Sequence, residues 1–275
     1  MRFGTFIGKC KSAEELAARA HLHGYTAVGV DTALTSTPEA RRDYVETMRR
    51  HEIQLAEVGA WSNPISPIPE QRRDALEHCK RCLALADEVG ARCCVNIAGS
   101  RGLKWDGPHP ENLTNETFDL IVQSVREIVD AVKPMRSFYA LETMPWIFPD
   151  SADSYLALVK AIDRKSLAVH YDPVNMINCP ERLFNNADQI REFTAKLGPH
   201  IRSVHVKDIR LGENLTVHLD ECRPGTGSLD HATLFRELAK LDPEISVMME
   251  HLPEEEYPLA AKYLRNAAAS AGVKL

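Results

Sequence analysis

The chain has 275 residues, of which 44% are hydrophobic and 26% are charged, an ordinary composition for one large α/β domain or two small ones. The formal net charge of -6 lacks the basic excess of a nucleic-acid-binding protein, so we expect no nucleic-acid partner. No apolar run approaches the length of a membrane span, so we expect no membrane partner either.

The cysteines and the N-terminal segment predict a reducing, cytoplasmic location. The seven cysteines are an odd number without a framework spacing, which favours free thiols. The apolar run 3–7 is too short for the core of a secretory signal. Cys79 and Cys82 fall in the middle of a predicted helix, where a structural role is expected instead of redox activity.

Short apolar, β-branched runs alternate along the chain with stretches of helical periodicity. The predicted strands lie near residues 3–7, 26–31, 53–60, 92–97, 137–142, 167–172, 201–207 and 244–250. The predicted helices lie near residues 12–23, 38–51, 69–89, 114–132, 151–162, 185–197, 230–240 and 254–270. Start and stop signals support several helices: a capping box of Ser12 with Glu15, Ser151 with Ser154, Pro38 in a first turn, and glycines at 24 and 90.

This order of elements predicts a single α/β domain over residues 1–275, folded as a (β/α)8 TIM barrel. The competing architecture is a doubly wound sheet. It would normally carry a Gly-rich phosphate-binding turn after an early strand, and the run GTFIGKC after the first predicted strand is not one.

Four metal-seeking side chains close four consecutive predicted strands: Glu142, Asp172, His205 and Glu250. Side chains alternate along a strand, and the residues that alternate with these four are largely apolar. The four should therefore point into the barrel at its C-terminal end, where barrels place their active sites. Any one of them can instead be a strand-end acid that meets an arginine, but four in phase favour a metal site. Three carboxylates and one imidazole suit one divalent ion such as Mn²⁺, Mg²⁺ or Co²⁺, with Zn²⁺ as a further candidate.

The order of these four residues resembles the xylose-isomerase-like TIM barrel superfamily, with its D-tagatose 3-epimerase, hydroxypyruvate isomerase and inosose dehydratase branches. The run Arg223-Pro224-Gly225-Thr226-Gly227 is similar to a loop of the epimerases, and His205-Val206-Lys207-Asp208 is similar to the H-x-K-D run of inosose dehydratases. The resemblance implies that Glu142, Asp172, His205 and Glu250 hold one divalent metal. It also implies that Glu142 and Glu250 are the catalytic acid/base pair and that the protein is a homodimer or homotetramer.

We therefore expect a divalent-metal-dependent isomerase or epimerase of a sugar or related small hydroxy-carbonyl compound. A metal bound to the carbonyl and the neighbouring hydroxyl acidifies the C–H bond between them and stabilises the enediolate. One carboxylate then removes the proton and a second returns one.

Two departures from the family pattern keep a second hypothesis open, a metal-dependent dehydratase of the inosose or dehydroshikimate dehydratase type. Asn175 stands where many members carry a histidine, and an amide cannot shuttle a proton. The segment 208–222, expected as a hairpin over the mouth, lengthens the chain between His205 and Arg223. An endonuclease would need more histidine ligands and a basic face, and a non-catalytic barrel would bind no metal.

Residues around the predicted mouth are candidate substrate contacts. Asn175, Lys207 and Arg223 can hold substrate oxygens, although Lys207 can instead pair with Asp208 or Glu221 and Arg223 can anchor its own loop. All three tryptophans follow predicted strands and can stack on a sugar or plug the barrel top: Trp61, Trp105 and Trp146. Asn63 and Asn96 are weaker candidates. The long loop 98–113 is expected to be a lid. His170 is expected to lie in the core, and His251 to point away from the site unless its strand has already ended.

Overall fold

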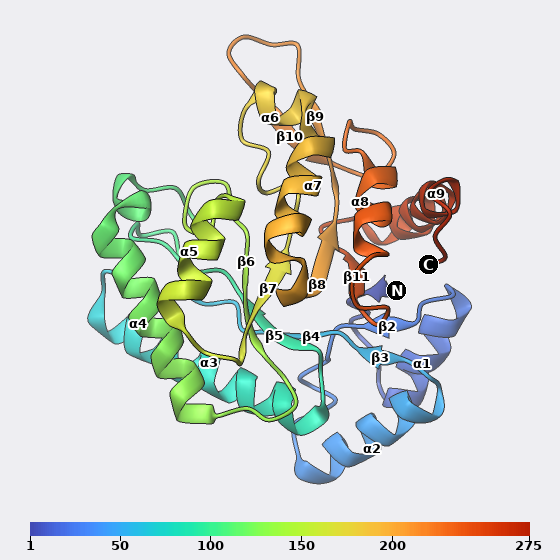
Figure 1. Cartoon of the computed structure of the whole chain (residues 1–275). Helices are drawn as coiled ribbons and strands as arrows, with labels where there is room; N and C mark the ends of the chain where they lie inside the picture. The colour runs from blue at the N-terminus through green and yellow to red at the C-terminus, as the bar shows by residue number, and fades with distance from the viewer.

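The computed structural model describes residues 1–275 and shows a parallel barrel wrapped by helices (Figure 1). The barrel strands are β1 (Arg2–Thr5), β2 (Ala27–Val28), β3 (Gln54–Leu55), β4 (Glu57–Gly59), β5 (Cys93–Asn96), β6 (Tyr139–Glu142), β7 (Leu167–Tyr171), β8 (Ile201–Val206) and β11 (Ser246–Met249). They form one sheet in the order β3-β2-β1-β11-β8-β7-β6-β5-β4. The predicted single-domain (β/α)8 architecture is confirmed.

The sheet closes on itself through the predicted strand 53–60, which is split in two at Ala56. Strand β3 pairs with β2, and β4 pairs with β5. The amide of Ala56 donates to Val28 and its carbonyl accepts from Cys93, so a single residue bonds to both neighbouring strands. The nine strand segments are thus the eight strands of a closed barrel.

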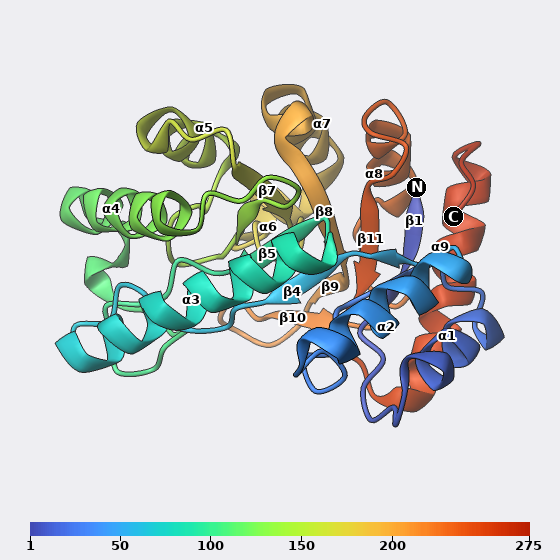
Figure 2. The ribbon, with the colours of Figure 1, turned by 90° about the horizontal axis from the view of Figure 1, so that it is seen from below.

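The chain forms nine α-helices. They are α1 (Ala13–Leu22), α2 (Pro38–Arg50), α3 (Pro69–Val89), α4 (Asn115–Val132), α5 (Ala152–Ile162), α6 (Pro180–Phe184), α7 (Asn186–Leu197), α8 (His231–Leu238) and α9 (Tyr257–Ser270). All but the short α6 lie around the outside of the sheet, which Figure 2 shows from below. Three short 3-10 turns precede α4, β8 and α9, at Pro110–Leu113, Gly198–His200 and Glu254–Glu256. None of the helices combines the length and the apolar character that crossing a bilayer requires.

The predicted helix signals hold with two differences. Ser12 accepts from the amide of Glu15, but the Glu15 carboxylate accepts from Lys11, so the predicted capping box is incomplete. The complete box belongs to Ser151 and Ser154. The short helix α6 was not predicted. Its Arg182 donates to carbonyls of the loops that follow β6 and β7, which holds α6 against the barrel top.

Two kinds of core divide the molecule. A cluster of 61 buried residues fills the space between the strands and the helices. The barrel interior instead carries small side chains at several positions, including Ala27, Ala56, Ala140 and Ala168. These leave room for larger polar groups inside the barrel, among them the buried His170. Cys79 and Cys82 are buried on α3, and all seven cysteines are free.

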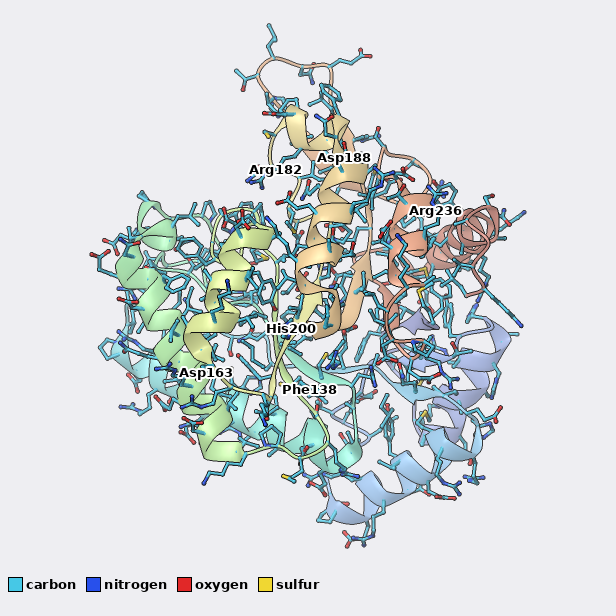
Figure 3. All side chains as sticks on the ribbon, in the orientation of Figure 1. Phe138, Asp163, Arg182, Asp188, His200 and Arg236 are labelled. Atoms are coloured by element: carbon cyan, nitrogen blue, oxygen red, sulfur yellow. The ribbon has the colours of Figure 1, made fainter.

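The carboxyl ends of the strands carry an added hairpin, β9 (Asp208–Leu211) with the antiparallel β10 (Leu219–Cys222). This confirms the hairpin expected for segment 208–222, and in Figure 1 its tip projects beyond α6. In Figure 3, Phe138 and His200, just before β6 and β8, are labelled near the middle of the view, well below Arg182 on α6. The strands of this region therefore run towards the hairpin.

Candidate metal centre

The four predicted ligands meet at the carboxyl end of the barrel. Glu142 ends β6, Asp172 directly follows β7, His205 lies in β8, and Glu250 directly follows β11. Their ligand-capable atoms all lie within 4.8 Å of one another. The Asp172 side chain is fully buried, and even the most exposed of the four, Glu250, is only 18% exposed. The expected inward orientation of all four is confirmed.

His205 joins two of the carboxylates through one ring nitrogen. Its Nδ1 lies 3.3 Å from Glu142 Oε1 and 2.9 Å from Glu250 Oε1. The opposite nitrogen, Nε2, donates to Glu57 Oε1 at 3.0 Å. A metal-ligating histidine commonly donates its second N–H to a carboxylate in this way, which fixes the tautomer and the ring orientation. Nδ1 is therefore the nitrogen available to a metal.

Glu57 is a functional residue that the sequence did not reveal. Besides His205, its carboxylate accepts from His170 Nε2 at 3.2 Å and from Ser203 Oγ at 3.0 Å. It lies on β4, on the far side of the barrel from β7 and β8, and reaches across the interior beneath the cluster. His170 is buried as expected and supports the same carboxylate.

Two buried carboxylate oxygens, Asp172 Oδ2 and Glu250 Oε1, make no aligned hydrogen bond and face only the positively charged groups of the cluster. The Nζ atom of Lys207 lies 2.9 Å from the first and 2.7 Å from the second, but neither contact has hydrogen-bond alignment. These contacts, with His205 Nδ1 2.9 Å from Glu250 Oε1, balance the charge of both oxygens. A divalent cation that took up their lone pairs would complete their coordination. Three carboxylates and one imidazole, with these two oxygens directed into the cluster, fit one divalent ion.

Charge coupling within the cluster decides its protonation. Burial disfavours a charge on His205, but the carboxylates of Glu250, Glu57 and Glu142 outweigh it and raise the imidazole pKa well above its usual value. Burial would likewise raise the pKa of Glu250, yet His205 and Lys207 hold it well below its usual range. His205 similarly lowers the pKa of Glu142 against burial.

Asp172 is the exception among the carboxylates. Burial raises its pKa to about 6, against the pull of the neighbouring Lys207 ammonium. In return, Asp172 and Glu250 raise the pKa of Lys207 well above its usual value despite burial. Glu142 and Glu250 are therefore ionised at neutral pH, and Asp172 is the carboxylate nearest to titration.

Lys207 lies within the cluster, where it is 2% exposed, and pairs with Asp172, Glu250 and Glu221. Of the two alternatives for a rim ion pair, only Glu221 is in contact, at 3.3 Å. Asp208 turns away and accepts from four backbone amides at 2.9–3.0 Å, those of Ile209, Gly225, Gly227 and Leu229. The Asp208 of the H-x-K-D run therefore anchors the loop that contains Pro224-Gly225-Thr226-Gly227.

A cavity of about 850 Å³ opens over the cluster and includes Glu142, His205, Lys207 and Glu250 in its wall. Most of the predicted substrate contacts also line it: Asn175, Trp61, Trp105 and Trp146. Asn175 donates from Nδ2 to Glu142 Oε1 at 3.1 Å, and its Oδ1 accepts from Lys207 Nζ at 3.4 Å. Asn175 thus holds one proposed ligand and faces the cavity.

The structure does not support two of the predicted substrate contacts, Asn63 and Arg223. Asn63 lies outside the cavity wall, and its side-chain amide is hydrogen-bonded to backbone groups of Ser100 and Ile65. Arg223 also lies outside that wall, 3.7 Å from Glu256, and contacts its own loop at Pro224. Strand-end position suggested a role for Asn63 and motif similarity for Arg223, but both stabilise loops. The weaker candidate Asn96 is likewise buried, against Cys79 and Tyr139.

His251 meets the stated exception to its outward orientation. Strand β11 ends at Met249, and His251 has a φ of 55°, so the alternation that would have turned it outward no longer applies. Its ring lines the cavity, with Nδ1 3.2 Å from Glu221 Oε1 and Nε2 3.6 Å from Glu250 Oε2.

The long loop 98–113 covers one side of the cavity through Lys104, Trp105 and Asp106. Internal bonds to the Gly107 carbonyl from Ser100 and Asn112 hold the loop in shape. Trp146 Nε1 donates to the Asp106 carbonyl at 2.9 Å and so joins this loop to the one after β6. Its opening and closing as a lid stays a prediction.

Sequence comparison decides the family. Residues 17–267 match the model of the xylose isomerase-like TIM barrel. The chain belongs to the xylose isomerase-like TIM barrel family. This confirms the resemblance seen in the ligand order. No curated protein sequence matches the chain.

Solved structures of this family share the fold at low sequence identity. The probable 3-DHS dehydratase AsbF from Bacillus anthracis is 13% identical, with a TM-score of 0.72 and coverage of 96% of this chain and 97% of that one. The 3-keto-D-glucoside 4-epimerase YcjR from E. coli is 17% identical, with a TM-score of 0.70 and coverage of 97% and 99%. A xylose isomerase-like protein from Mycobacterium smegmatis, in complex with magnesium, is 14% identical, with a TM-score of 0.67 and coverage of 94% and 87%.

Proposed function

We propose that the protein is a divalent-metal-dependent isomerase or epimerase of a sugar or a related small hydroxy-carbonyl compound. The observation that carries the proposal is the convergence of four largely buried, metal-ligating side chains, Glu142, Asp172, His205 and Glu250, within 4.8 Å of one another. The site lies at the carboxyl end of the barrel, where enzymes of this architecture act. The structural similarity to a 3-keto-D-glucoside 4-epimerase supports the choice.

In this proposal, the two glutamates transfer protons on opposite sides of a substrate. Strands β6 and β11 are separated in the sheet by β7 and β8, so Glu142 and Glu250 approach the centre from different directions. Both have lowered pKa values, so both are bases at neutral pH. When bound, a divalent ion such as Mn²⁺, Mg²⁺ or Co²⁺ acidifies the C–H bond beside a carbonyl. One glutamate then takes that proton, and the other returns one to the opposite face of the carbon.

A specific observation favours a second candidate, a metal-dependent dehydratase. Lys207 is a buried ammonium that lines the cavity 2.7 Å from Glu250. A cation in this position can stabilise a departing hydroxyl after a glutamate has removed the neighbouring proton. The Asn175 amide cannot return that proton. The similarity to a probable 3-DHS dehydratase supports the same alternative.

Deuterium exchange distinguishes the candidates. The protein, loaded with Mn²⁺, would be incubated in deuterated water with ketoses, inososes, 3-keto sugars and 2-keto acids. Deuterium at one carbon of an isomeric product supports the isomerase, and a product that has lost water supports the dehydratase. If no compound exchanges with Mn²⁺, Mg²⁺ or Co²⁺, the proposal is wrong. Glu142→Gln should abolish exchange, and Glu39→Gln on exposed α2 is the matched control.

A further inference from the structure

The cavity above the cluster has a second half of different chemistry. The proposed ligands approach it from β6, β7, β8 and β11. The wall near the ends of β1, β2, β4 and β5 includes the apolar and aromatic side chains of Phe6, Val30, Trp61, Ile97 and Trp105, with Thr32, Glu57, Lys104 and Asp106 beside them. A small sugar held on the charged half would leave this wall facing water.

Aromatic side chains of this wall are unusually exposed. Phe6 is 58% exposed, Trp61 43% and Trp105 38%. Trp146, at 37%, extends the same wall towards the charged half. Contiguous exposed apolar surface in a cleft marks a binding site, and all three tryptophans of the chain lie in this one. The apolar partner that would cover them is therefore a ligand.

Glycines at two strand ends create the space in which these rings lie. A Cβ atom at Gly59 would lie 2.4 Å from Trp61 Nε1, and one at Gly29 would lie 2.9 Å from the Phe6 ring. Both rings therefore lie against backbone that has no side chain, and both glycines line the cavity. On the other side, the bond from Trp146 to the loop 98–113 fixes a third ring. The aromatic wall is thus held in place from two sides.

The cavity has room for more than a monosaccharide. Its volume of about 850 Å³ lies near the upper end of the ~300–1,000 Å³ usual for small-ligand sites. The aromatic wall lines part of this space.

We propose, as an extension of the proposed function, that the substrate is a sugar-like hydroxy-carbonyl group carrying a planar aromatic substituent, such as an aryl glycoside. The sugar-like part lies at the cluster, and the aromatic ring packs among Phe6, Trp61 and Trp105. Offset or edge contacts between rings add to the burial of apolar area, which suits this wall better than a second sugar.

A pair of probes that differ only in the ring tests this inference. Phenyl and methyl glucosides, each oxidised to the ketone at the same ring carbon, would be titrated into the Mn²⁺-loaded protein by calorimetry. The phenyl compound should bind at least about tenfold more tightly. Phe6→Ala and Trp61→Ala should reduce this ratio severalfold. Phe184→Ala, which removes an exposed ring outside the cavity, should leave it unchanged.

Equal affinity for the two probes would overturn the inference, as would a ratio that survives both Phe6→Ala and Trp61→Ala. Phe6 is more than half exposed, so its truncation should leave the fold intact even if Trp61→Ala does not fold. Metal affinity, measured without any probe, separates the two proposals. Mn²⁺ binding and deuterium exchange with equal probe affinities would contradict the aromatic subsite alone, whereas no exchange with any compound would contradict the proposed function.

Discussion

The two halves of the barrel mouth differ in the chemistry of their side chains. In the half formed by β6, β7, β8 and β11, four metal-ligating side chains at strand ends converge within 4.8 Å of one another. In the half formed by β1, β2, β4 and β5, loop aromatics lie over glycines and present apolar surface. Strand ends place groups rigidly enough for chemistry, whereas loops shape the space for the rest of a ligand.

Glu57 links the two halves inside the barrel, as the Trp146 bond to the loop 98–113 does at its mouth. Glu57 belongs to β4, yet its carboxylate accepts hydrogen bonds from His170 on β7 and His205 on β8, across the barrel. Burial opposes its charge, but His205 and His170 hold its pKa well below the usual range. The charged half therefore depends on one residue from the aromatic half.

Removing a proposed base should have the largest effect. Glu142→Gln keeps the size and the hydrogen-bonding capacity of the side chain but removes its charge and its basicity. We expect kcat to fall about a thousandfold or more, because both proton transfer and metal binding lose a group. Steady-state kinetics on the substrate found by exchange measures this. Activity within tenfold of the unchanged protein would show that Glu142 is not the base.

Loss of the link between the halves should weaken metal binding. Glu57→Gln leaves His205 without its carboxylate partner, and we expect the Kd for Mn²⁺ to rise about 10- to 100-fold. Calorimetry measures the Kd, and circular dichroism checks the fold. Glu244→Gln, on the exposed side of the barrel bottom, is the matched control and should leave the Kd unchanged. An equal Kd in Glu57→Gln would show that the carboxylate only fills the interior.

Metal affinity should rise with pH because of the protonation of the cluster. The pKa of His205 is raised, so in the metal-free protein the ring carries a proton that a metal must displace. Below the pKa of Asp172, about 6, a second proton must leave. The association constant should therefore increase about tenfold per pH unit near neutrality and more steeply below pH 6. Calorimetry in two buffers of different ionisation enthalpy counts the protons released. Identical heats at pH 7 would contradict this account.

The smallest effect is expected when an aromatic residue is removed and the Kd for Mn²⁺ is measured. Trp61→Ala should leave the Kd for Mn²⁺ within about twofold, because distant sites that share no contacts act nearly independently. The same calorimetric titration measures it. A large loss would show that the two halves are coupled and that their separation does not hold.

Much of the charged half could be predicted from the sequence. Alternation along a strand places Glu142, Asp172, His205 and Glu250 on one face, and parallel barrel strands bring their ends together. The same rule fails at Glu57 because of a local irregularity. Ala56 packs inside the barrel with Ala27 and Met248, and its neighbour Glu57 faces the interior as well. Two successive inward residues interrupt the alternation between β3 and β4, and no sequence pattern marks that interruption.

Less of the aromatic half could be predicted from the sequence. The tryptophans could be placed in loops after strands, but not the glycines that hold Trp61 and Phe6 in position, because those contacts depend on loop paths. The same limit explains Asn63 and Arg223. Their partners are backbone groups of neighbouring loops, or a glutamate brought near by the fold, and a sequence does not show which backbone groups lack donors.

The central claim is that one divalent ion lies among Glu142, Asp172, His205 and Glu250. Anomalous diffraction from crystals grown with Mn²⁺ tests it most directly. We predict a single strong peak within bonding distance of three carboxylates and of His205 Nδ1, with Nε2 still donating to Glu57. No peak at this position, or a peak held by other residues, would contradict the account.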